Sequence, residues 1–356
     1  MTQAVLPAML SGLRVLDLSR NLPGPFATRM LADLGATIIK VEPPEGDPTR
    51  PLQALFEALN HGKECRRIDF KDAGELQRLR DWAQDVDVVI DSFRPGVMQA
   101  MGLDHARLAE RNPKLVMVSI TGYGQQGPWA SKAGHDLNFM AMSGVLDQMR
   151  SPSGELALSN VQWGDMAGGS SMACMAVLAA VFEAQRTGRG RALDVSMVHG
   201  LYAHLLMPVA TGQFIQTFSG RWPGAGEDLL NGALPCYNLY ATADGRTLAV
   251  GALEHKFWRE VCAVLGREDW AQLHWQRGVL PHSPESNHLK DEVARLIASR
   301  PLAVWVERFD AADCCVTPVL TLAEAQRHPL FEGDTRLPWQ EQASARLISR
   351  GAPASG

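Results

Sequence analysis

One stretch of the sequence decides the fold: Leu13-Arg-Val-Leu-Asp-Leu-Ser-Arg-Asn-Leu-Pro-Gly-Pro-Phe-Ala-Thr-Arg-Met-Leu-Ala-Asp-Leu-Gly-Ala-Thr-Ile-Ile-Lys-Val41. Its apolar runs predict strands over 13–18 and 36–41, and the pattern between them predicts a helix over 26–34 that ends at Gly35. A strand, a helix and a strand within about 30 residues form a right-handed βαβ unit. Such a unit requires a parallel sheet with helices on both faces, so the chain begins with an α/β domain.

The segments that follow extend this sheet. A long apolar helix begins after Asp165, and the small residues Gly168 and Gly169 near its start let another backbone approach closely. We therefore expect a large α/β domain over residues 1–210, whose parallel sheet is covered on both faces. Its further predicted elements are strands over 86–90, 115–120 and 192–197 and a polar helix over 73–84.

A second domain is expected because 356 residues exceed what one core of about 100–200 residues fills. The segment 211–224 is rich in Gly, Pro and polar side chains, which is typical of a linker. After it, a hairpin pattern and helical patterns predict a smaller α+β domain over 225–318. The predicted hairpin strands are 236–242 and 247–251, and the predicted helices are 256–265 and 289–309.

The composition excludes several classes of partner. The formal net charge is −5 and 21% of the residues are charged, which argues against a nucleic-acid or anionic membrane surface. The apolar run Met172–Phe182 is about half of the roughly 20 residues that a membrane helix needs. Six scattered cysteines and an N-terminus without signal-peptide features predict a reducing compartment, so we expect a cytoplasmic protein with no membrane partner.

The sequence argues against the common cofactors. The turn Leu22–Pro25 contains two prolines in place of the GxGxxG fingerprint, so few N–H groups remain to bind the pyrophosphate of NAD. HExxH, HxxxH and GxSxG motifs are absent, and Cys314 and Cys315 are adjacent where a metal site needs spacing. We therefore expect no metal and no redox cofactor.

The remaining candidates for chemistry are one histidine and a few carboxylates. His135 and Asp136 follow a glycine-rich loop, Asp165 precedes the long apolar helix, and Glu254 lies at a strand-to-helix junction. Each has a purely structural alternative as a helix cap. Beside a carbonyl group, however, a histidine and a partly desolvated carboxylate suit proton transfer, and a carboxylate also suits nucleophilic chemistry.

These residues occur within a series of longer motifs. On these motifs the chain resembles the family III CoA transferases, and among them the α-methylacyl-CoA racemases. The resemblance covers nearly the whole chain. The motifs are Leu10-Ser-Gly-Leu-Arg-Val-Leu-Asp-Leu18, Leu31-Ala-Asp-Leu-Gly-Ala36, Lys40-Val-Glu-Pro-Pro44, Ser92-Phe-Arg-Pro-Gly96, Thr121-Gly-Tyr-Gly-Gln-Gln-Gly-Pro128, Gly134-His-Asp136, Gly164-Asp165 and Cys315-Val-Thr-Pro-Val319.

The resemblance implies a large, doubly wound, Rossmann-like α/β domain, to which residues 320–356 return, and a small α+β domain, in an interlocked homodimer. It points to the racemase branch at one position. Racemases carry Gly-His-Asp where His135 stands, whereas typical transferases carry another residue, often tyrosine. Asp165 follows 165 − 135 = 30 positions later, which is the racemase-like spacing. The stretch from Leu230 to Glu254 also resembles the racemases.

The implied reaction inverts the α-carbon of a 2-methylacyl-CoA thioester, which is the substrate and not a cofactor. His135 and Asp165 act as the two bases, one on each face, and Glu254 orients His135. Asp136 lies beside the thioester, and the N–H groups from Asp165 to Gly168 receive the enolate oxygen. Gly134 and Phe139, in the same segment as His135, are candidates for substrate contact.

Two alternatives stay open. In a CoA transferase, Asp165 attacks the acyl-CoA to form a mixed anhydride and then an enzyme-bound thioester. In a non-catalytic homologue, the acyl-CoA is bound only. In every case Arg94 and Lys71 are expected to meet the CoA phosphates. Pro43 and Ala100 stand where some racemases carry arginines, so the phosphate contacts of this chain are expected to differ in part.

Overall fold

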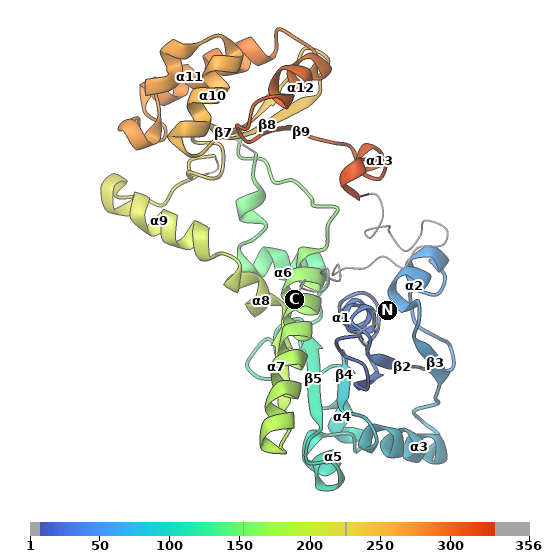
Figure 1. Ribbon diagram of the computed structural model, residues 1–356. Helices are drawn as coiled ribbons and strands as arrows, with labels where there is room; N and C mark the ends of the chain where they lie inside the picture. The colour runs from blue at the N-terminus through green and yellow to red at the C-terminus, as the bar shows by residue number, and fades with distance from the viewer. Residues whose placement is uncertain (1–7, 152, 225, 332–356) are drawn as a thin grey trace. The chain divides into compact units, whose positions relative to one another are not determined.

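The computed structural model describes residues 8–151, 153–224 and 226–331. These residues form two compact units (Figure 1). Unit 1 consists of 8–145, 159–204 and 329–331, and unit 2 consists of 146–158 and 205–328 without positions 152 and 225. Of the stretch 320–356, which we expected to return to the large domain, residues 332–356 lie outside the described residues.

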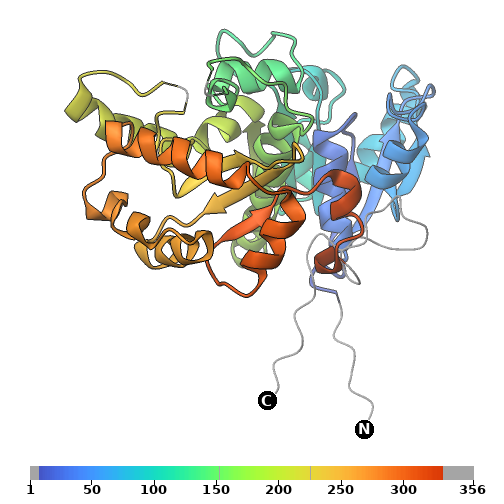
Figure 2. The same cartoon turned by 90° about the horizontal axis from the view of Figure 1, so that it is seen from above.

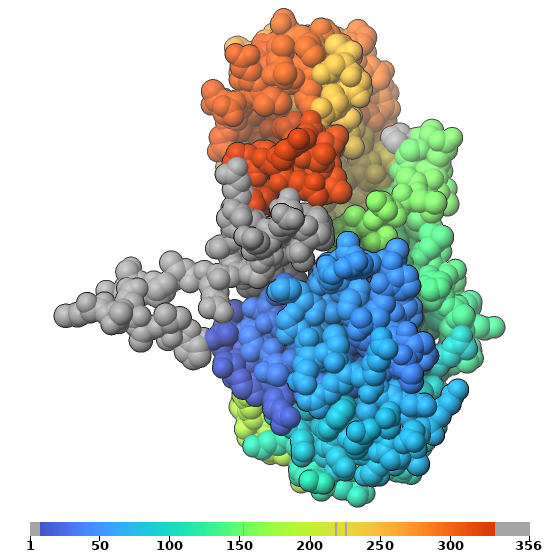
Figure 3. Space-filling model, turned by 90° about the vertical axis from the view of Figure 1, so that its right-hand side faces the viewer, coloured from blue at the N-terminus to red at the C-terminus, as the bar shows by residue number. Residues whose placement is uncertain are grey.

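Unit 1 is built on a six-stranded sheet in the order β3-β2-β1-β4-β5-β6, and every neighbouring pair is parallel. This confirms the predicted α/β fold. The N-terminal part of the chain, drawn in blue, forms the face of unit 1 seen in Figure 3. The strands are β1 (Arg14–Asp17), β2 (Thr37–Glu42), β3 (Glu64–Arg67), β4 (Val88–Asp91), β5 (Val116–Thr121) and β6 (Ala192–Ser196).

Two layers of helices accompany the sheet. Helix α1 contacts β1, β2 and α7, and α7 also contacts β5. The helices α3 and α5 form the other layer, where Leu79 and Leu108 pack with Leu16 and Val89 of the strands. The helices of unit 1 are α1 (Pro23–Asp33), α2 (Gln53–Asn60), α3 (Ala73–Gln84), α4 (Val97–Ala100), α5 (His105–Arg111), α6 (Asp136–Ser143), α7 (Met172–Thr187), α8 (Met197–Ala203), the π-helical η2 (Gly164–Ser171) and the short η5 (Pro329–Phe331).

The strand order places a switch point between β1 and β4. From β1 the chain moves to β2 and β3 on one side, and from β4 it moves to β5 and β6 on the other. The loops that leave the carboxyl ends of β1 and β4 therefore diverge, and open α/β sheets bind ligands in the crevice between such loops. Helix α1 begins at Pro23, earlier than predicted, because proline fits the first turn of a helix, where its missing N–H has no partner to lose.

The helical run Gly164–Thr187 unites η2 and α7. Among the described residues it is the one helix long and apolar enough to cross a membrane, by length and composition only. Within unit 1 it contacts α1, α8 and β5, and the core helix of an α/β domain passes the same test. Of its apolar stretch 39% is buried, while Met175 and Phe182 are exposed.

Unit 2 contains an antiparallel sheet of three strands in the order β7-β8-β9. Its core gathers Trp258, Trp305 and Tyr240, and Figure 2 shows the orange helices beside these strands. The predicted linker 211–224 is helical up to Ser219. The elements are η1 (Asp147–Met149), α9 (Leu206–Ser219), β7 (Tyr237–Ala241), β8 (Thr247–Gly251), α10 (His255–Leu265), η3 (Glu268–Gln272), η4 (Trp275–Arg277), α11 (Pro284–Ile297), α12 (Leu302–Asp310), β9 (Val316–Pro318) and α13 (Leu322–Ala325).

Candidate functional site

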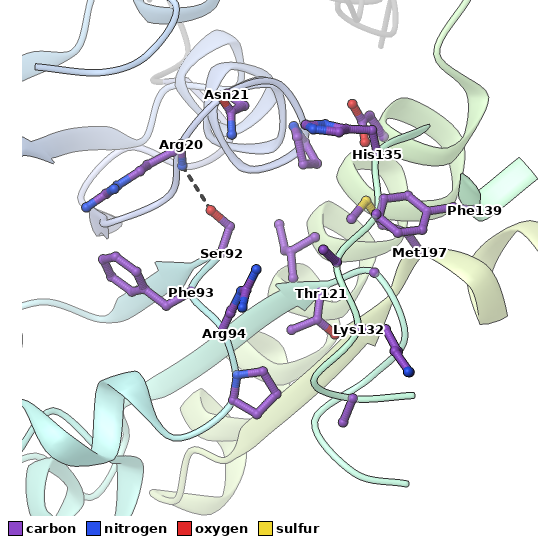
Figure 4. A pocket seen from close by; sticks show the side chains of 18 residues that line it. Arg20, Asn21, Ser92, Phe93, Arg94, Thr121, Lys132, His135, Phe139 and Met197 are labelled. Atoms are coloured by element: carbon purple, nitrogen blue, oxygen red, sulfur yellow. Dashed lines mark hydrogen bonds between the residues drawn. The ribbon is translucent and has the colours of Figure 1, made fainter. Parts of the chain in front are cut away.

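A cavity of about 380 Å³ lies in unit 1 at the switch point of the sheet. Arg20 and Asn21 reach it from the loop after β1, and Ser92, Phe93 and Arg94 reach it from the loop after β4. Figure 4 shows these side chains around one space together with those of the later site segments. The cavity therefore occupies the crevice that the strand order predicts.

Three cations line the cavity. Arg20 and Arg94 form its basic side, at the loops after β1 and β4, and Lys132 lies on the side of Phe139 and Met197 (Figure 4). Among the described residues no carboxylate forms an ion pair with any of the three. The N–H of Arg20 donates to Ser92 Oγ at 3.0 Å, and the Arg20 guanidinium carbon lies 5.2 Å from the centre of the Phe93 ring. Three cations without an internal anion suit a phosphate-bearing ligand.

The opposite side carries His135 and Asp165, which line the same cavity. His135 is the exposed N-cap residue of α6, and its backbone N–H donates to Asn138 Oδ1 at 3.0 Å. His135 forms a capping box with Asn138 at the start of α6, as the structural alternative requires, and its imidazole also lies at the cavity (Figure 4). An imidazole and a carboxylate at one cavity suit proton transfer.

Asp136, the first residue of α6, binds the backbone at the start of η2. Its Oδ1 accepts the N–H of Gly164 at 2.6 Å and the N–H of Asp165 at 3.1 Å. Two of the N–H groups that are free at the start of a helix are therefore bound by a carboxylate from α6. Asp136 fixes the backbone of Asp165 relative to α6.

The carboxyl group of Asp165 is half-buried and has an altered acidity. Burial, and secondarily the negative charge of Asp136, raises its pKa to about 7. No cation offsets this effect, and a carboxyl group with such a pKa exists in both protonation states near neutral pH. Asp165 is therefore suited to accept a proton in one step and to donate one in another.

Phe139 forms the floor of the cavity and is only 3% exposed. A Cβ atom added to Gly134 would lie 2.7 Å from the Phe139 ring, and a Cβ atom on Gly122 would approach it still more closely. The ring fits because neither of these residues has a side chain. The predicted substrate residues Gly134 and Phe139 thus both line the cavity, and they also shape it.

Two other predicted residues lie elsewhere. Gly168 is buried against α8, where a Cβ atom would lie 2.5 Å from Met197 O, and it does not line the cavity. The N–H of Met166 donates to Gln162 O at 2.9 Å, and the N–H groups before it belong to Asp136. Of the N–H groups that we expected to receive an enolate oxygen, those of Asp165 and Met166 therefore already have acceptors. Lys71 is exposed in the turn before α3, and it also does not line the cavity.

Glu254 belongs to unit 2, where it is the N-cap residue of α10. Its side chain forms no capping hydrogen bond. The backbone around it is held by η4: Trp275 Nε1 donates to Leu253 O at 2.7 Å, and the N–H of His255 donates to Gln276 Oε1 at 2.9 Å. The Glu254 side chain thus does not cap α10, and its carboxylate remains available for another partner.

Sequence reasoning missed the cations Arg20 and Lys132. The signal for Arg20 was available, because it follows the first strand and residues at the carboxyl ends of strands beside a switch point contact ligands. The position of Lys132 is set by the loop 122–135, which no periodic pattern predicts. Among the described residues, no group of three or more His, Cys, Asp or Glu side chains is placed to hold a metal ion.

Comparisons with known proteins agree with the geometry. The family model described as CoA-transferase family III matches residues 10–341. The α-methylacyl-CoA racemase of Mus musculus is 35% identical over 322 residues, which are 90% of this chain and 80% of that protein. The acetyl-CoA:oxalate CoA-transferase of Acetobacter aceti is 33% identical over 333 residues, with 89% and 82% covered.

A solved structure supports the same fold. The crystal structure of Rv3272 from Mycobacterium tuberculosis superimposes with a TM-score of 0.77 at 29% identity, covering 92% of this chain and 86% of that one. A racemase and a transferase therefore resemble this chain to similar extents, and the choice between their reactions depends on the site residues.

Proposed function

We propose that this chain, which belongs to CoA-transferase family III, interconverts the two epimers of 2-methylacyl-CoA thioesters. The observation that carries the proposal is the composition of one cavity, which brings together His135, Asp165 and the cations Arg20, Arg94 and Lys132. His135 and Asp165 suit the removal and return of a proton, and the three cations suit the phosphates of CoA.

The α-proton of a thioester is weakly acidic, so its removal needs a base close to the carbon. In one direction Asp165 takes the proton and the His135 imidazolium returns one to the opposite face; in the other direction the roles are exchanged. Because the pKa of Asp165 is raised to about 7, the carboxyl group is competent in both roles near neutral pH. No metal or redox cofactor takes part in this scheme.

The neighbouring residues have supporting roles in the proposal. Asp136 holds the Asp165 backbone by its two N–H bonds and keeps the pKa of Asp165 high. Glu254, whose side chain caps nothing, orients His135 in an interlocked homodimer. Pro43 and Ala100 carry no charge that could bind the phosphates of CoA. In their place, the cations Arg20 and Lys132 make phosphate contacts. We further propose that the protein acts in the cytoplasm.

The test uses one pure epimer of a 2-methylacyl-CoA in D2O. Racemisation predicts that deuterium enters the α-carbon while optical purity is lost. NMR follows the exchange, and chromatography on a chiral column follows the epimers. Asp165→Asn serves as the matched control, because it keeps the shape of the side chain and removes its basicity. Retention of both the α-proton and the configuration in the wild-type reaction contradicts the proposal.

A second candidate is CoA transfer between carboxylic acids, and it is favoured by the transferase relative of similar identity. Here the Asp165 carboxylate attacks the thioester carbonyl, CoA leaves as thiolate, and a mixed anhydride forms. Hydroxylamine would cleave that anhydride: attack at the acyl carbonyl releases an acyl hydroxamate and the Asp165 carboxylate, and attack at the aspartyl carbonyl leaves a hydroxamate on Asp165. Mass spectrometry would detect both products. The appearance of a new acyl-CoA after a carboxylate is added, without deuterium at the α-carbon, selects this candidate.

A further inference from the structure

A set of charged side chains, all buried except Arg50, lies beneath the loop that follows β1, and the proposed reaction does not use it. The set consists of Lys40, Lys63, Arg50, Asp17, Glu42 and Asp47. Its cations and carboxylates form three ion pairs: Lys40 with Asp47 at 3.0 Å, Lys63 with Asp17 at 3.3 Å and Arg50 with Glu42 at 2.5 Å. The side chains in the two lysine pairs are at most 1% exposed.

Buried ion pairs add little to stability, since removing both charges from water costs about as much as their attraction returns. Their best-attested use is to select one local conformation. The question is therefore which conformation this set selects. Its hydrogen bonds to the backbone give the answer.

Lys40 connects the loop after β1 with the loop after β2. Its Nζ donates to Ser19 O at 3.0 Å, in the loop after β1, and pairs with Asp47, in the loop after β2. Asp47 is itself held, because its Oδ1 accepts the N–H of Thr49 at 2.8 Å and the Thr49 hydroxyl at 2.6 Å. The loop after β2 therefore fixes the position of the Ser19 carbonyl through Lys40.

Lys63 and Asp17 hold the remaining parts of the same loop. Asp17 Oδ1 accepts the N–H of Ser19 at 3.0 Å, and Lys63 Nζ donates to Pro25 O at 2.8 Å. Both ends of the segment 19–25 are thus attached to buried charges. A segment held at both ends has few ways to move its central residues.

Arg20 and Asn21 lie in this segment and line the cavity. The chain turns at Asn21, which has φ = 64°, a left-handed conformation that asparagine adopts more readily than most other residues besides glycine. The buried charges hold the chain on both sides of this turn, at Ser19 and at Pro25. They therefore restrict the loop conformation that presents Arg20.

We infer that Lys40 and Asp47 are a positioning pair that sets Arg20 for contact with the phosphates of the CoA thioester. This inference rests on the proposed function, because it requires that the cavity bind CoA. Neither residue touches the ligand; they act through Ser19 and the loop. Loss of the pair should weaken the binding of the CoA phosphates and leave the binding of the rest of the ligand unchanged.

The experiment replaces the pair with neutral residues of similar size, Lys40→Met with Asp47→Asn. Calorimetry measures Kd for CoA and for pantetheine, which lacks the phosphates. We expect Kd for CoA to rise about tenfold and Kd for pantetheine to stay constant. The matched control is Arg29→Met with Asp33→Asn, which removes the buried Arg29–Asp33 ion pair of α1, 3.0 Å long, without touching the loop after β1. This control should keep the preference for CoA.

The two hypotheses fail in different ways. A wild-type protein without any preference for CoA over pantetheine contradicts the proposed function. A wild-type protein with that preference, retained in full by the folded double variant, overturns the positioning role. Should the double variant not fold, Thr49→Val loosens Asp47 alone, and it should show a smaller loss of the same preference. An unchanged preference in folded Thr49→Val then overturns the inference.

Discussion

The two sides of the cavity use buried or half-buried aspartates in opposite ways. Beneath the basic side, burial alone would raise the pKa of Asp17, but the charges of Lys63 and Lys40 and the hydrogen bonds from Ser19 and Thr28 hold the pKa below its usual value. On the other side, burial and the neighbouring Asp136 raise the pKa of Asp165 to about 7. Burial thus raises the pKa of a carboxyl group unless neighbouring cations and hydrogen-bond donors offset it.

The largest effect is expected for Asp165→Asn. It removes the proposed base, so exchange of the α-proton from the epimer that Asp165 serves should fall about 10³-fold. The variant also removes the repulsion between Asp165 and Asp136, so the free energy of unfolding should not fall. Deuterium exchange and urea unfolding measure the two quantities. If Asp165→Asn lowers the free energy of unfolding and leaves the exchange of the α-proton unchanged, Asp165 is a structural residue and not the base.

On the basic side the corresponding change, Asp17→Asn, should act on stability. It leaves Lys63 buried without its anion, which costs about 3 kcal/mol of unfolding free energy. Because the folded-state pKa of Asp17 is below its unfolded value, the stabilisation is present at neutral pH. It declines as the pH falls below the ordinary value of an aspartate. Urea unfolding at several pH values checks this; a difference between wild type and variant that grows in acid contradicts it.

His135→Gln should separate exchange from inversion. Racemisation must slow equally in both directions, on the order of 100-fold, because the equilibrium between the epimers cannot change. Exchange from the epimer that Asp165 deprotonates should persist, while exchange from the other epimer should be lost. NMR of each pure epimer in D2O measures this asymmetry. Equal, mild losses for both epimers would remove the two-base assignment.

Arg20→Met tests the basic side by substrate affinity. Loss of one charged phosphate contact should raise KM for the acyl-CoA about tenfold. The value of kcat should stay nearly constant, because Arg20 is remote from the proton transfer. Steady-state kinetics with an acyl-CoA and with the matching acyl-pantetheine separate the two effects. An equal rise of KM for both substrates would show that Arg20 shapes the cavity and does not bind phosphate.

The smallest effect is expected for Asp136→Asn. The amide still accepts N–H bonds at Gly164 and Asp165, but the negative charge is gone, so the pKa of Asp165 should fall toward its usual value. Burial is the larger cause of the raised pKa and remains, so the fall should be partial. Where Asp165 is the base, the rate rises with pH through the pKa of Asp165, and this limb should move to lower pH. The pH profile of exchange measures the shift, and a limb that moves to higher pH contradicts the assignment.

Much of the fold was predictable because its signals are local. The βαβ unit of 13–41 and the hairpin of unit 2 appear as apolar runs and turn residues. The strand Glu64–Arg67 was missed, since it lies at the sheet edge and its polar side chains leave no apolar pattern. The break between α11 and α12 at Pro301 was also missed, although proline commonly marks such a boundary.

For the site, the sequence supplied the residue types and the structure supplied their neighbours. His135, Arg94, Gly134, Phe139 and Asp165 were candidates from their motifs, and the structure gathers them around one cavity. Gly168 and Lys71 were candidates by the same reasoning and do not line it. A motif records that a residue belongs to a segment, but the direction of its side chain depends on the packing of other segments.

The α/β class, most elements of the sheet domain and the candidate His135 follow from the sequence alone, because hydrophobic periodicity and motif identity are properties of neighbouring residues along the chain. Only the tertiary structure decided that Arg20 and Lys132 face the cavity, that Asp136 binds the N–H groups before Asp165, and that buried lysines hold the loop after β1. Hydrogen bonds and charge effects act over a few ångströms in space, and they join residues that lie far apart in the sequence.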